Sequence, residues 1–341
     1  MTEATRRKFD PTSLIRRPEF GAFIGTVVVL IFFSIVGGAS FTQPGGIASW
    51  LNVGAELGII ALPVALVMIA GDLDLSVGSS LAAGGTTMAV VSGFFNLPTW
   101  IGVLAGLLMG VLIGLVNGIV LVRTNLPSFV VTLATNFAVF GLVLGFTKLI
   151  TGTIAVDIHP DPIIKNTLGS LMGGLFETAI VIWVIVAVIV SWILYKSIYG
   201  NWIYAIGGDM VSARSTGIPV NKVRIWLYVG TGFASALVGV IQTALYDSAQ
   251  VNAGQSFVFN SIIAVVVGGV LLTGGYGSTI GVILGTMTFA IVNQGIFYTG
   301  WDSDWASLIL GILLLIAVLT NNTFRRLAIT GGKKKGQKSN D

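Results

Sequence analysis

Residues 99–122 read TWIGVLAGLLMGVLIGLVNGIVLV, a stretch without one charged side chain. A helix needs about 20 mostly apolar residues to cross the hydrocarbon core of a bilayer, so this stretch is long enough to do so. Glycines recur along it every four residues, which places them on one helical face: Gly102, Gly106, Gly110, Gly114 and Gly118. Such a stripe lets a neighbouring backbone approach closely. The stretch therefore predicts a membrane helix packed tightly inside a bundle.

Other apolar stretches lie on both sides of this one, and together they predict an all-α, polytopic membrane protein of about ten transmembrane helices. The long gaps between them are 149–177 and 196–224, so little chain is left for a separate domain. We expect one transmembrane domain over residues 21–322. The predicted spans are 21–37, 53–71, 77–93, 99–122, 128–148, 178–195, 225–245, 258–273, 279–298 and 305–321.

The composition excludes several classes of protein. Charged residues make up 9% of the 341 residues, whereas soluble globular chains carry about 25%. A chain so poor in charge cannot cover a water-facing surface, which excludes a soluble enzyme, a nucleic-acid binder and a disordered protein. Cysteine is absent and His159 is the single histidine, so the sequence offers no disulfide, no thiolate nucleophile and no zinc ligand set.

The distribution of Lys and Arg predicts the orientation. With the N-terminus in the cytoplasm, all but two of the 18 basic residues fall on cytoplasmic segments, and the exceptions are Lys148 and Lys165. We therefore expect an even number of spans, a cytoplasmic N-terminal segment over residues 1–20 and a basic cytoplasmic tail over residues 323–341. The tail can contact anionic membrane lipids, although an ordinary cytoplasmic end explains its charge as well.

Two carboxylates interrupt the apolar pattern in the segment GDLDLSVG at 71–78. Carboxylates are costly in hydrocarbon, so we expect Asp72 and Asp74 in a turn at the inner face of the membrane. One interpretation is helix capping, in which Asp74 or Ser76 accepts hydrogen bonds from the free N–H groups of the third helix. The other is a gate or a contact with a partner. No nucleophile–base pair or metal set accompanies them, so an enzyme is not expected.

Polar residues inside the spans are candidates for a path through the membrane. Glu56 lies in the second span without a basic neighbour, and it either reaches water at the outer end or has a functional role. The uncharged residues either tie helices together or line a wet path for a neutral, hydroxylated solute. The candidates are Asn52, Glu56, Asn117, Thr135, Asn136, Gln242, Asn293 and Gln294.

The long connection 196–224 reads GGDMVSARSTGI at 207–218, which predicts a short helix that ends at Gly217 and is followed by Pro219. It resembles the G-G-N-x-x-A-A-R-x-S-G-I pattern of the inner-membrane permeases of bacterial ABC importers for monosaccharides, the ribose, xylose, arabinose and galactoside type. Segments 74–78, 127–133 and 262–285 resemble further blocks of that family in the same order, so the resemblance covers residues 50 to 322. Asp72 and Tyr276 stand where the family more often has Gly and Arg. The matching positions in 207–218 are Gly207, Gly208, Ala213, Arg214, Gly217 and Ile218, whereas Asp209, Ser212 and Thr216 depart from the pattern.

The resemblance implies a permease subunit in the bacterial inner membrane that translocates a monosaccharide or polyol by alternating access. Its implied partners are a second permease subunit, a cytoplasmic ABC ATPase and a periplasmic or lipid-anchored sugar-binding protein. Segment 207–218 is the implied site of coupling to the ATPase, and Asp72, Asp74, Ser76 and Tyr276 are candidates for an inner turn or gate. The chain lacks a Gly-x-x-x-x-Gly-Lys-Ser/Thr loop, so we expect the partner to bind and hydrolyse ATP and this chain to bind no cofactor.

The alternative is a self-sufficient secondary transporter or channel for a small neutral solute. It would transport without an ATPase, and it would normally contain an ion or proton site and broken helices arranged as inverted repeats.

Overall fold

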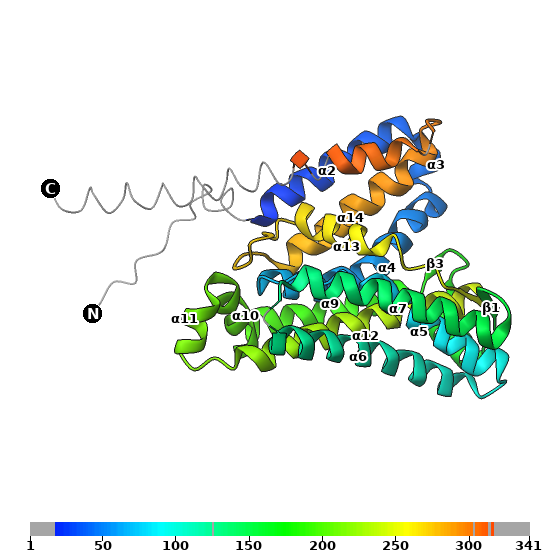
Figure 1. Ribbon diagram of the computed structural model, residues 1–341. Helices are drawn as coiled ribbons and strands as arrows, with labels where there is room; N and C mark the ends of the chain where they lie inside the picture. The colour runs from blue at the N-terminus through cyan, green and yellow to red at the C-terminus, as the bar shows by residue number, and fades with distance from the viewer. Residues whose placement is uncertain (1–17, 125, 303, 313–314, 317–341) are drawn as a thin grey trace, which may run out of the picture.

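The computed structural model describes residues 18–124, 126–302, 304–312 and 315–316. Over these residues the protein is a bundle of α-helices with only two short β-ribbons (Figure 1). Its longer helices are α2 (Pro18–Val36), α4 (Pro44–Ile69), α5 (Val77–Ala89), α6 (Thr99–Thr124), α7 (Ser128–Thr151), α9 (Ala179–Lys196), α12 (Val220–Tyr246) and α14 (Thr279–Gly295). Its shorter helices are α3 (Gly38–Thr42), α8 (Pro162–Leu168), α10 (Ile198–Gly208), α11 (Met210–Ser215) and α13 (Phe257–Val267).

Seven helices in the described residues are long and apolar enough to cross a membrane, namely α2, α4, α6, α7, α9, α12 and α14. The prediction of an all-α polytopic membrane protein is therefore confirmed. The third predicted span is α5 continued by one π-helical turn, Val90–Phe94, and the eighth is shorter than predicted because α13 already ends at Val267. The tenth predicted span, 305–321, lies partly outside the described residues, as do most of 1–20 and all of 323–341.

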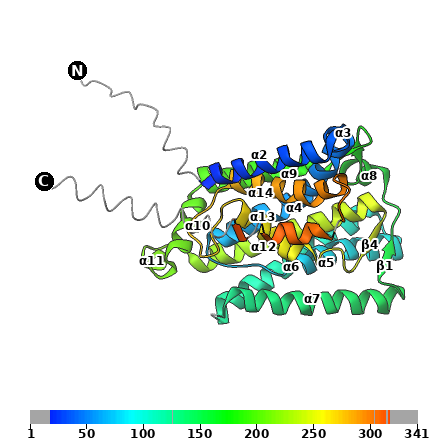
Figure 2. The ribbon, with the colours of Figure 1, turned by 90° about the horizontal axis from the view of Figure 1, so that it is seen from above.

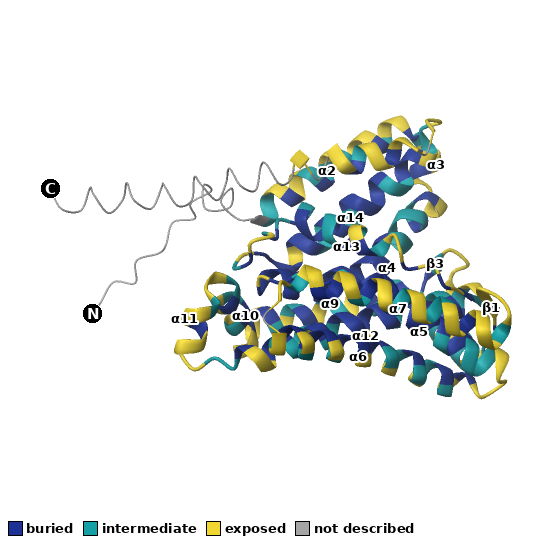
Figure 3. Ribbon diagram, in the orientation of Figure 1, coloured by how far each residue is buried: buried dark blue, intermediate teal, exposed yellow. Residues whose placement is uncertain are grey.

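Burial separates central helices from peripheral ones. The apolar window of α4 is 89% buried, whereas those of α2, α7 and α9 are 11%, 17% and 22% buried. Figure 3 shows the exposed residues on the outer helices and the buried ones at the centre. Because the exposed faces of α2, α7 and α9 carry large apolar side chains, they suit lipid or another subunit rather than water.

The glycine stripe of α6 packs as the sequence predicts. A Cβ at Gly110 would overlap the carbonyl oxygen of Gly232, and one at Gly114 would overlap that of Tyr228, both on α12. A Cβ at Gly106 would meet the carbonyl of Gly84 on α5 in the same way. Only glycine permits these approaches, so the stripe fixes α6 against α5 and α12.

The two ends of the bundle differ (Figure 1). Helices α10 and α11 project at one end, here called the α11 end. At the other, the strand end, β1 (Ala155–Asp157) pairs antiparallel with β4 (Ser248–Gln250), and β2 (Leu171–Met172) pairs with β3 (Phe176–Glu177). A single 3-10 turn, Ile296–Tyr298, follows α14. Helix α12 runs from the α11 end to the strand end, so its residue numbers measure depth in the bundle.

Candidate functional site

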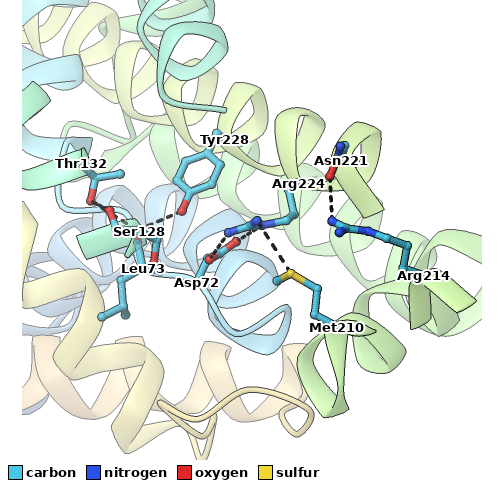
Figure 4. Close-up of polar contacts among 9 residues, drawn as sticks. All are labelled: Asp72, Leu73, Ser128, Thr132, Met210, Arg214, Asn221, Arg224 and Tyr228. Carbon is cyan, nitrogen blue, oxygen red and sulfur yellow. Dashed lines mark hydrogen bonds and ion pairs between the residues drawn. The ribbon is translucent and has the colours of Figure 1, made fainter. Parts of the chain in front are cut away.

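The segment between α4 and α5 returns into the bundle instead of turning at its surface. Three side chains of α12 spaced by four and three residues hold it, because that spacing puts them on one helical face. Arg224 donates to both oxygens of Asp72, at 2.7 and 2.8 Å. The Tyr228 hydroxyl donates to the carbonyl of Leu73 at 3.1 Å, and Thr231 donates to Asp74. Residues 72–74 therefore run alongside the first half of α12 (Figure 4).

Asp72 and Asp74 directly follow the turn at residues 70–71, and both are buried in protein; their position relative to the membrane face remains a prediction. Asp72 and Asp74 are 6% and 1% exposed, and the charge of each buried carboxylate is stabilised by its own partners. Asp72 has its ion pair with Arg224. Asp74 accepts from the backbone N–H and hydroxyl of Ser76 at 2.9 and 2.6 Å, in addition to Thr231. Paired or fully hydrogen-bonded carboxylates can be buried, which the local sequence does not reveal.

Helix α5 therefore begins deep in the bundle, and α7 caps it. Ser128 and Thr132 accept from the backbone N–H groups of Leu73 and Leu75 at 3.0 and 3.1 Å. Asn136 Oδ1 accepts from Ser79 N at 3.2 Å, which satisfies one free donor of the first turn of α5. Ser76 makes no capping hydrogen bond of its own, but its hydroxyl accepts from Asn117 at 2.8 Å.

A second broken helix meets the first one. After α12 the chain returns from the strand end and begins α13 at Phe257. Just before this start, a Cβ on Gly254 would overlap the carbonyl oxygen of Gly78 at the start of α5. Leu81, one turn further along α5, lies against Gly239, beyond the midpoint of α12. The N-terminal ends of α5 and α13 thus meet near the middle of the bundle.

The exposed backbone at this meeting point cannot face lipid. Asn252, Gln255 and Ser256 are exposed although they precede a helix start at mid-depth. Irregular backbone at membrane depth occurs only where it is buried in protein or lines a water-filled cavity. This face therefore lines a polar path or is covered by another subunit. Such broken helices form the substrate sites of many transporters.

The connection 196–224 is mostly helical and lies at the α11 end. Helix α11 begins after Asp209, whose carboxylate accepts from Ser212 N at 2.6 Å, and this hydrogen bond lowers the pKa of Asp209. It ends before Gly217, which has φ +86, as the sequence predicts for this short helix. Residues 220–224 are not loop but the first turn of α12. Arg214, on α11, donates to Asn221 of that turn at 3.2 Å (Figure 4).

Glycines join this segment to both inner turns of the bundle. Gly207, near the end of α10, lies so close to the end of α4 that a Cβ would overlap the carbonyl oxygen of Ile69. That oxygen accepts from the N–H of Gly275 at 2.8 Å, in the turn between α13 and α14. Gly71 and Gly274 meet at the same point. We call these four residues, Gly71, Gly207, Gly274 and Gly275, the glycine junction. At this junction the backbone of α10 contacts the backbones of both turns directly, with no side chain between them.

A second polar cluster lies at the strand end, around Glu56. Glu56 is 7% exposed, so it does not reach water, and its Oε2 accepts a hydrogen bond from the Gln242 amide at 2.8 Å. Asn52, one turn earlier on α4, accepts from Glu177 N and donates to the carbonyl of Leu175, both at 3.0 Å. It therefore ties the β2–β3 hairpin to α4. Both Glu56 and Glu177 keep one buried oxygen without a hydrogen-bond partner.

Burial raises the pKa of Glu177 to about 7, and this predicts a pH dependence of stability. The folded state then holds a proton that the unfolded state has lost above its pKa near 4.5. Stability should fall as the pH rises from about 4.5 to about 7, because the folded state binds more protons in that range. Glu177→Gln should match the wild type at pH 5 and be more stable than it at pH 8. Thermal unfolding in detergent at both pH values measures this, and equal midpoints at pH 8 would contradict the assignment.

A cavity of about 480 Å³ opens beside this cluster, between α5, α12 and β4. None of its lining residues carries a formal charge. The hydroxyl of Thr86 is buried there without a partner, and Gln242 separates the cavity from Glu56. Polar lining residues are Thr86, Gln242, Thr243, Tyr246, Ser248 and Gln250. The set suits a neutral solute that offers several hydroxyl groups.

The remaining candidates lie apart from these clusters. Thr135 is half-buried on α7, and Asn293 and Gln294 bond each other near the end of α14. Tyr276 lies in the turn between α13 and α14, 38% exposed, beside the glycine junction. Within the described residues, no group of three or more His, Cys, Asp and Glu side chains could hold a metal ion.

Sequence reasoning did not single out Arg224, Tyr228 or Thr231. Tyr228 and Thr231 lay on one face of the predicted span 225–245, which would have pointed to polar partners on a neighbouring element, whereas Arg224 lay in the predicted connection just before that span. Which residues those partners are depends on the tertiary fold.

Comparison with known proteins adds to this geometry. Residues 46–318 match the family described as branched-chain amino acid transport system, permease component. This chain belongs to that permease family. The ribose import permease protein RbsC of Bacillus subtilis is 34% identical over 325 residues, which covers 93% of this chain and 96% of the relative. The fructose import permease protein FrcC of Rhizobium meliloti is 30% identical, covering 91% and 87%. The probable ABC transporter permease protein YphD of Escherichia coli is 32% identical, covering 87% and 89%.

Family membership decides between the two hypotheses. Broken helices are present, although we expected them of a self-sufficient transporter, so they do not discriminate. Two of these relatives are sugar import permeases and the third is a probable ABC transporter permease, and the family match runs from α4 to beyond α14. The resemblance to monosaccharide permeases is thereby confirmed, and the alternative is not favoured.

Proposed function

We propose that this protein is the permease subunit of an ATP-binding-cassette importer that carries a monosaccharide or related polyol across the bacterial inner membrane. The observation that carries the proposal is the glycine junction, where α10 touches both inner turns of the transmembrane domain. A separate ATPase that pushes on α10–α11 would move both turns together. This fits a permease that another subunit drives, and it has no obvious use in a transporter that works alone.

The proposed orientation puts the α11 end in the cytoplasm and the strand end outside. The start of α2 points toward the α11 end of the bundle (Figure 1). The asymmetry of Lys and Arg supports the same orientation, with ten spans and both termini in the cytoplasm. A sugar-binding protein would then deliver the solute at the strand end, near the neutral cavity. A second permease subunit would cover the exposed backbone before α13.

A sugar fits the cavity better than a branched-chain amino acid, although the family description names amino acids. An amino acid carries both an ammonium and a carboxylate, and the cavity lining offers no charged side chain to either. Hydroxyl, amide and aromatic groups are the usual partners of a neutral hydroxylated solute. The substrate is tested by uptake of labelled ribose, fructose and leucine into proteoliposomes that contain the whole importer.

The partners are tested by tagging this chain, extracting it gently from native membranes and identifying what co-purifies by mass spectrometry. A nucleotide-binding subunit together with a sugar-binding protein supports the proposal. Recovery of this chain alone, active for uptake in liposomes without ATP, would overturn it in favour of the secondary transporter.

Arg214→Glu is expected to abolish ATP-driven uptake while the chain remains in the membrane. Arg214 lies on α11 and is exposed, where an ATPase would dock, and a carboxylate there reverses the local charge. Uptake into proteoliposomes with the ATPase measures the effect. The control is Asn221→Ala, which removes only the intramolecular partner of Arg214. It should keep uptake within about two-fold, and wild-type uptake by Arg214→Glu would remove Arg214 from the coupling surface.

A further inference from the structure

A second cavity, of about 690 Å³, lies between α9, α10 and α12, away from the polar clusters. Its floor is Pro63 and Leu66 of α4, and its walls are almost entirely apolar and aromatic. The cavity opens on an exposed face, because Trp226 at its edge is 71% exposed. We call this cavity the α9–α12 groove. An apolar groove on the surface of a membrane protein needs an occupant that is itself apolar.

The charged and aromatic residues of the groove are not spread evenly along it. Lys222, in the first turn of α12, is its single charged lining residue. Tyr199 and Trp202 of α10 lie at the same end, and Lys196 ends the neighbouring helix α9. Phe233 and Gly230 line it further along α12. Aromatic residues with Lys at one end and pure hydrocarbon beyond are the pattern of a site at a membrane–water interface.

A lipid fits this groove better than a second copy of the chain. A second copy of the chain would be expected to cover the exposed backbone at 252–256, which precedes α13, because such backbone must contact protein or water. The groove contains no such backbone. Figure 2 shows α7 and α9 on opposite sides of the molecule, with α4, α12 and α13 between them. The residues that line the groove lie on the helices α4, α9, α10 and α12, apart from Pro219, so the groove can face lipid directly.

Charge selects the kind of lipid. A lysine near the surface of the cytoplasmic leaflet attracts anionic headgroups, and none of the lining residues is acidic. We propose that the α9–α12 groove binds an anionic phospholipid of the inner leaflet, with its phosphate at Lys222 and an acyl chain along Gly230 and Phe233. The choice of leaflet rests on the proposed orientation. Because α10 forms one wall, the bound lipid supports the helix that ends in the glycine junction.

Two variants test the two halves of the site. Lys222→Gln removes the charge and leaves the apolar walls. Gly230→Leu fills the groove, because a Cβ at Gly230 meets no atom within 4 Å and the larger side chain therefore enters open space. Its matched control is Gly25→Leu on the exposed helix α2, where a Cβ also meets no atom within 4 Å.

The purified chain is studied by native mass spectrometry and by thermal unfolding in detergent with added phosphatidylglycerol or phosphatidylcholine. The wild type should retain phosphatidylglycerol and be stabilised more by it than by phosphatidylcholine. Lys222→Gln should lose about five-fold of this preference, the contribution of one lysine near an anionic surface. Gly230→Leu should lose the bound lipid, and Gly25→Leu should keep it. Neither measurement needs transport, so a failure here leaves the proposed function untouched.

Three results would overturn the proposal. One is a wild-type lipid preference in Lys222→Gln. Another is retained lipid in Gly230→Leu. A third is disulfide cross-linking of two copies through Trp226→Cys in native membranes, which would make the groove an interface between subunits. The chain has no cysteine of its own, so such a cross-link would be unambiguous.

Discussion

Arg224→Gln is expected to destabilise the protein by about 3–5 kcal/mol, because it leaves the carboxylate of Asp72 buried without its partner. Both side chains are nearly inaccessible, at 10% and 7%, so water cannot replace the lost guanidinium. The ion pair also joins α12 to the segment that returns into the bundle. Thermal unfolding in detergent should show a large drop in midpoint, and uptake should be lost. An unchanged midpoint would mean that the ion pair is not formed in the membrane.

The double variant Asp72→Asn, Arg224→Gln distinguishes the contribution of the ion pair to stability from its contribution to coupled movement. Removal of both charges together leaves no uncompensated ion, so most of the stability should return. The direct link between α12 and the returning segment stays weakened. If the pair carries movement from α11 to that segment, uptake should remain below about a tenth of wild type even though the midpoint recovers. Full recovery of uptake would reduce the pair to a structural role.

Local features of the sequence predicted much of the fold. Charge-free stretches located the long spans, because membrane helices are recognised by length and apolarity alone. The glycine stripe of α6 and the end of α11 at Gly217 were equally local, and the structure has both. The family was accessible too, because its motifs lie in contiguous blocks.

The broken helices were only partly predictable in this way. The sequence located the break between α4 and α5, between the predicted spans 53–71 and 77–93, but it did not show that residues 72–76 are held inside the bundle. Hydropathy alone predicted the eighth span at 258–273, because the apolar segment continues past Val267, where α13 ends and a turn follows. Both breaks depend on distant partners. Asp72, for example, is held by a residue 152 positions away.

The polar candidates show a similar limit. A polar residue in a span predicts a hydrogen bond but not its partner. Asn136 was a candidate for the path, and it caps α5 across the gap from α7. Asn52 binds the backbone of the β2–β3 hairpin. Gln242, in contrast, lines the neutral cavity while it binds Glu56, and its role in a path remains a prediction.

The glycine junction gives the sharpest test of coupling, because two adjacent glycines of the same motif have opposite surroundings. Gly207→Ala would drive a methyl group into the carbonyl of Ile69 and the N–H of Gly275. That overlap can be relieved only if α10 moves away from the inner turns. Overpacking of this kind costs about 1–3 kcal/mol, and 1.4 kcal/mol is already about a factor of ten in an equilibrium. Uptake should therefore fall by about five-fold or more.

Gly208→Ala is the matched control, because a Cβ at Gly208 meets nothing within 4 Å. It changes the same motif by the same methyl group, so any effect of helix propensity is shared. Its uptake should stay within about two-fold of wild type, with the ATPase still responsive to the loaded binding protein. In Gly207→Ala the ATPase should bind but lose that response, since the contact between α10 and both turns is broken. Equal uptake by the two variants would show that α10 does not transmit movement through its backbone contact with Ile69 and Gly275, and the coupling path would then have to run through Arg224 instead.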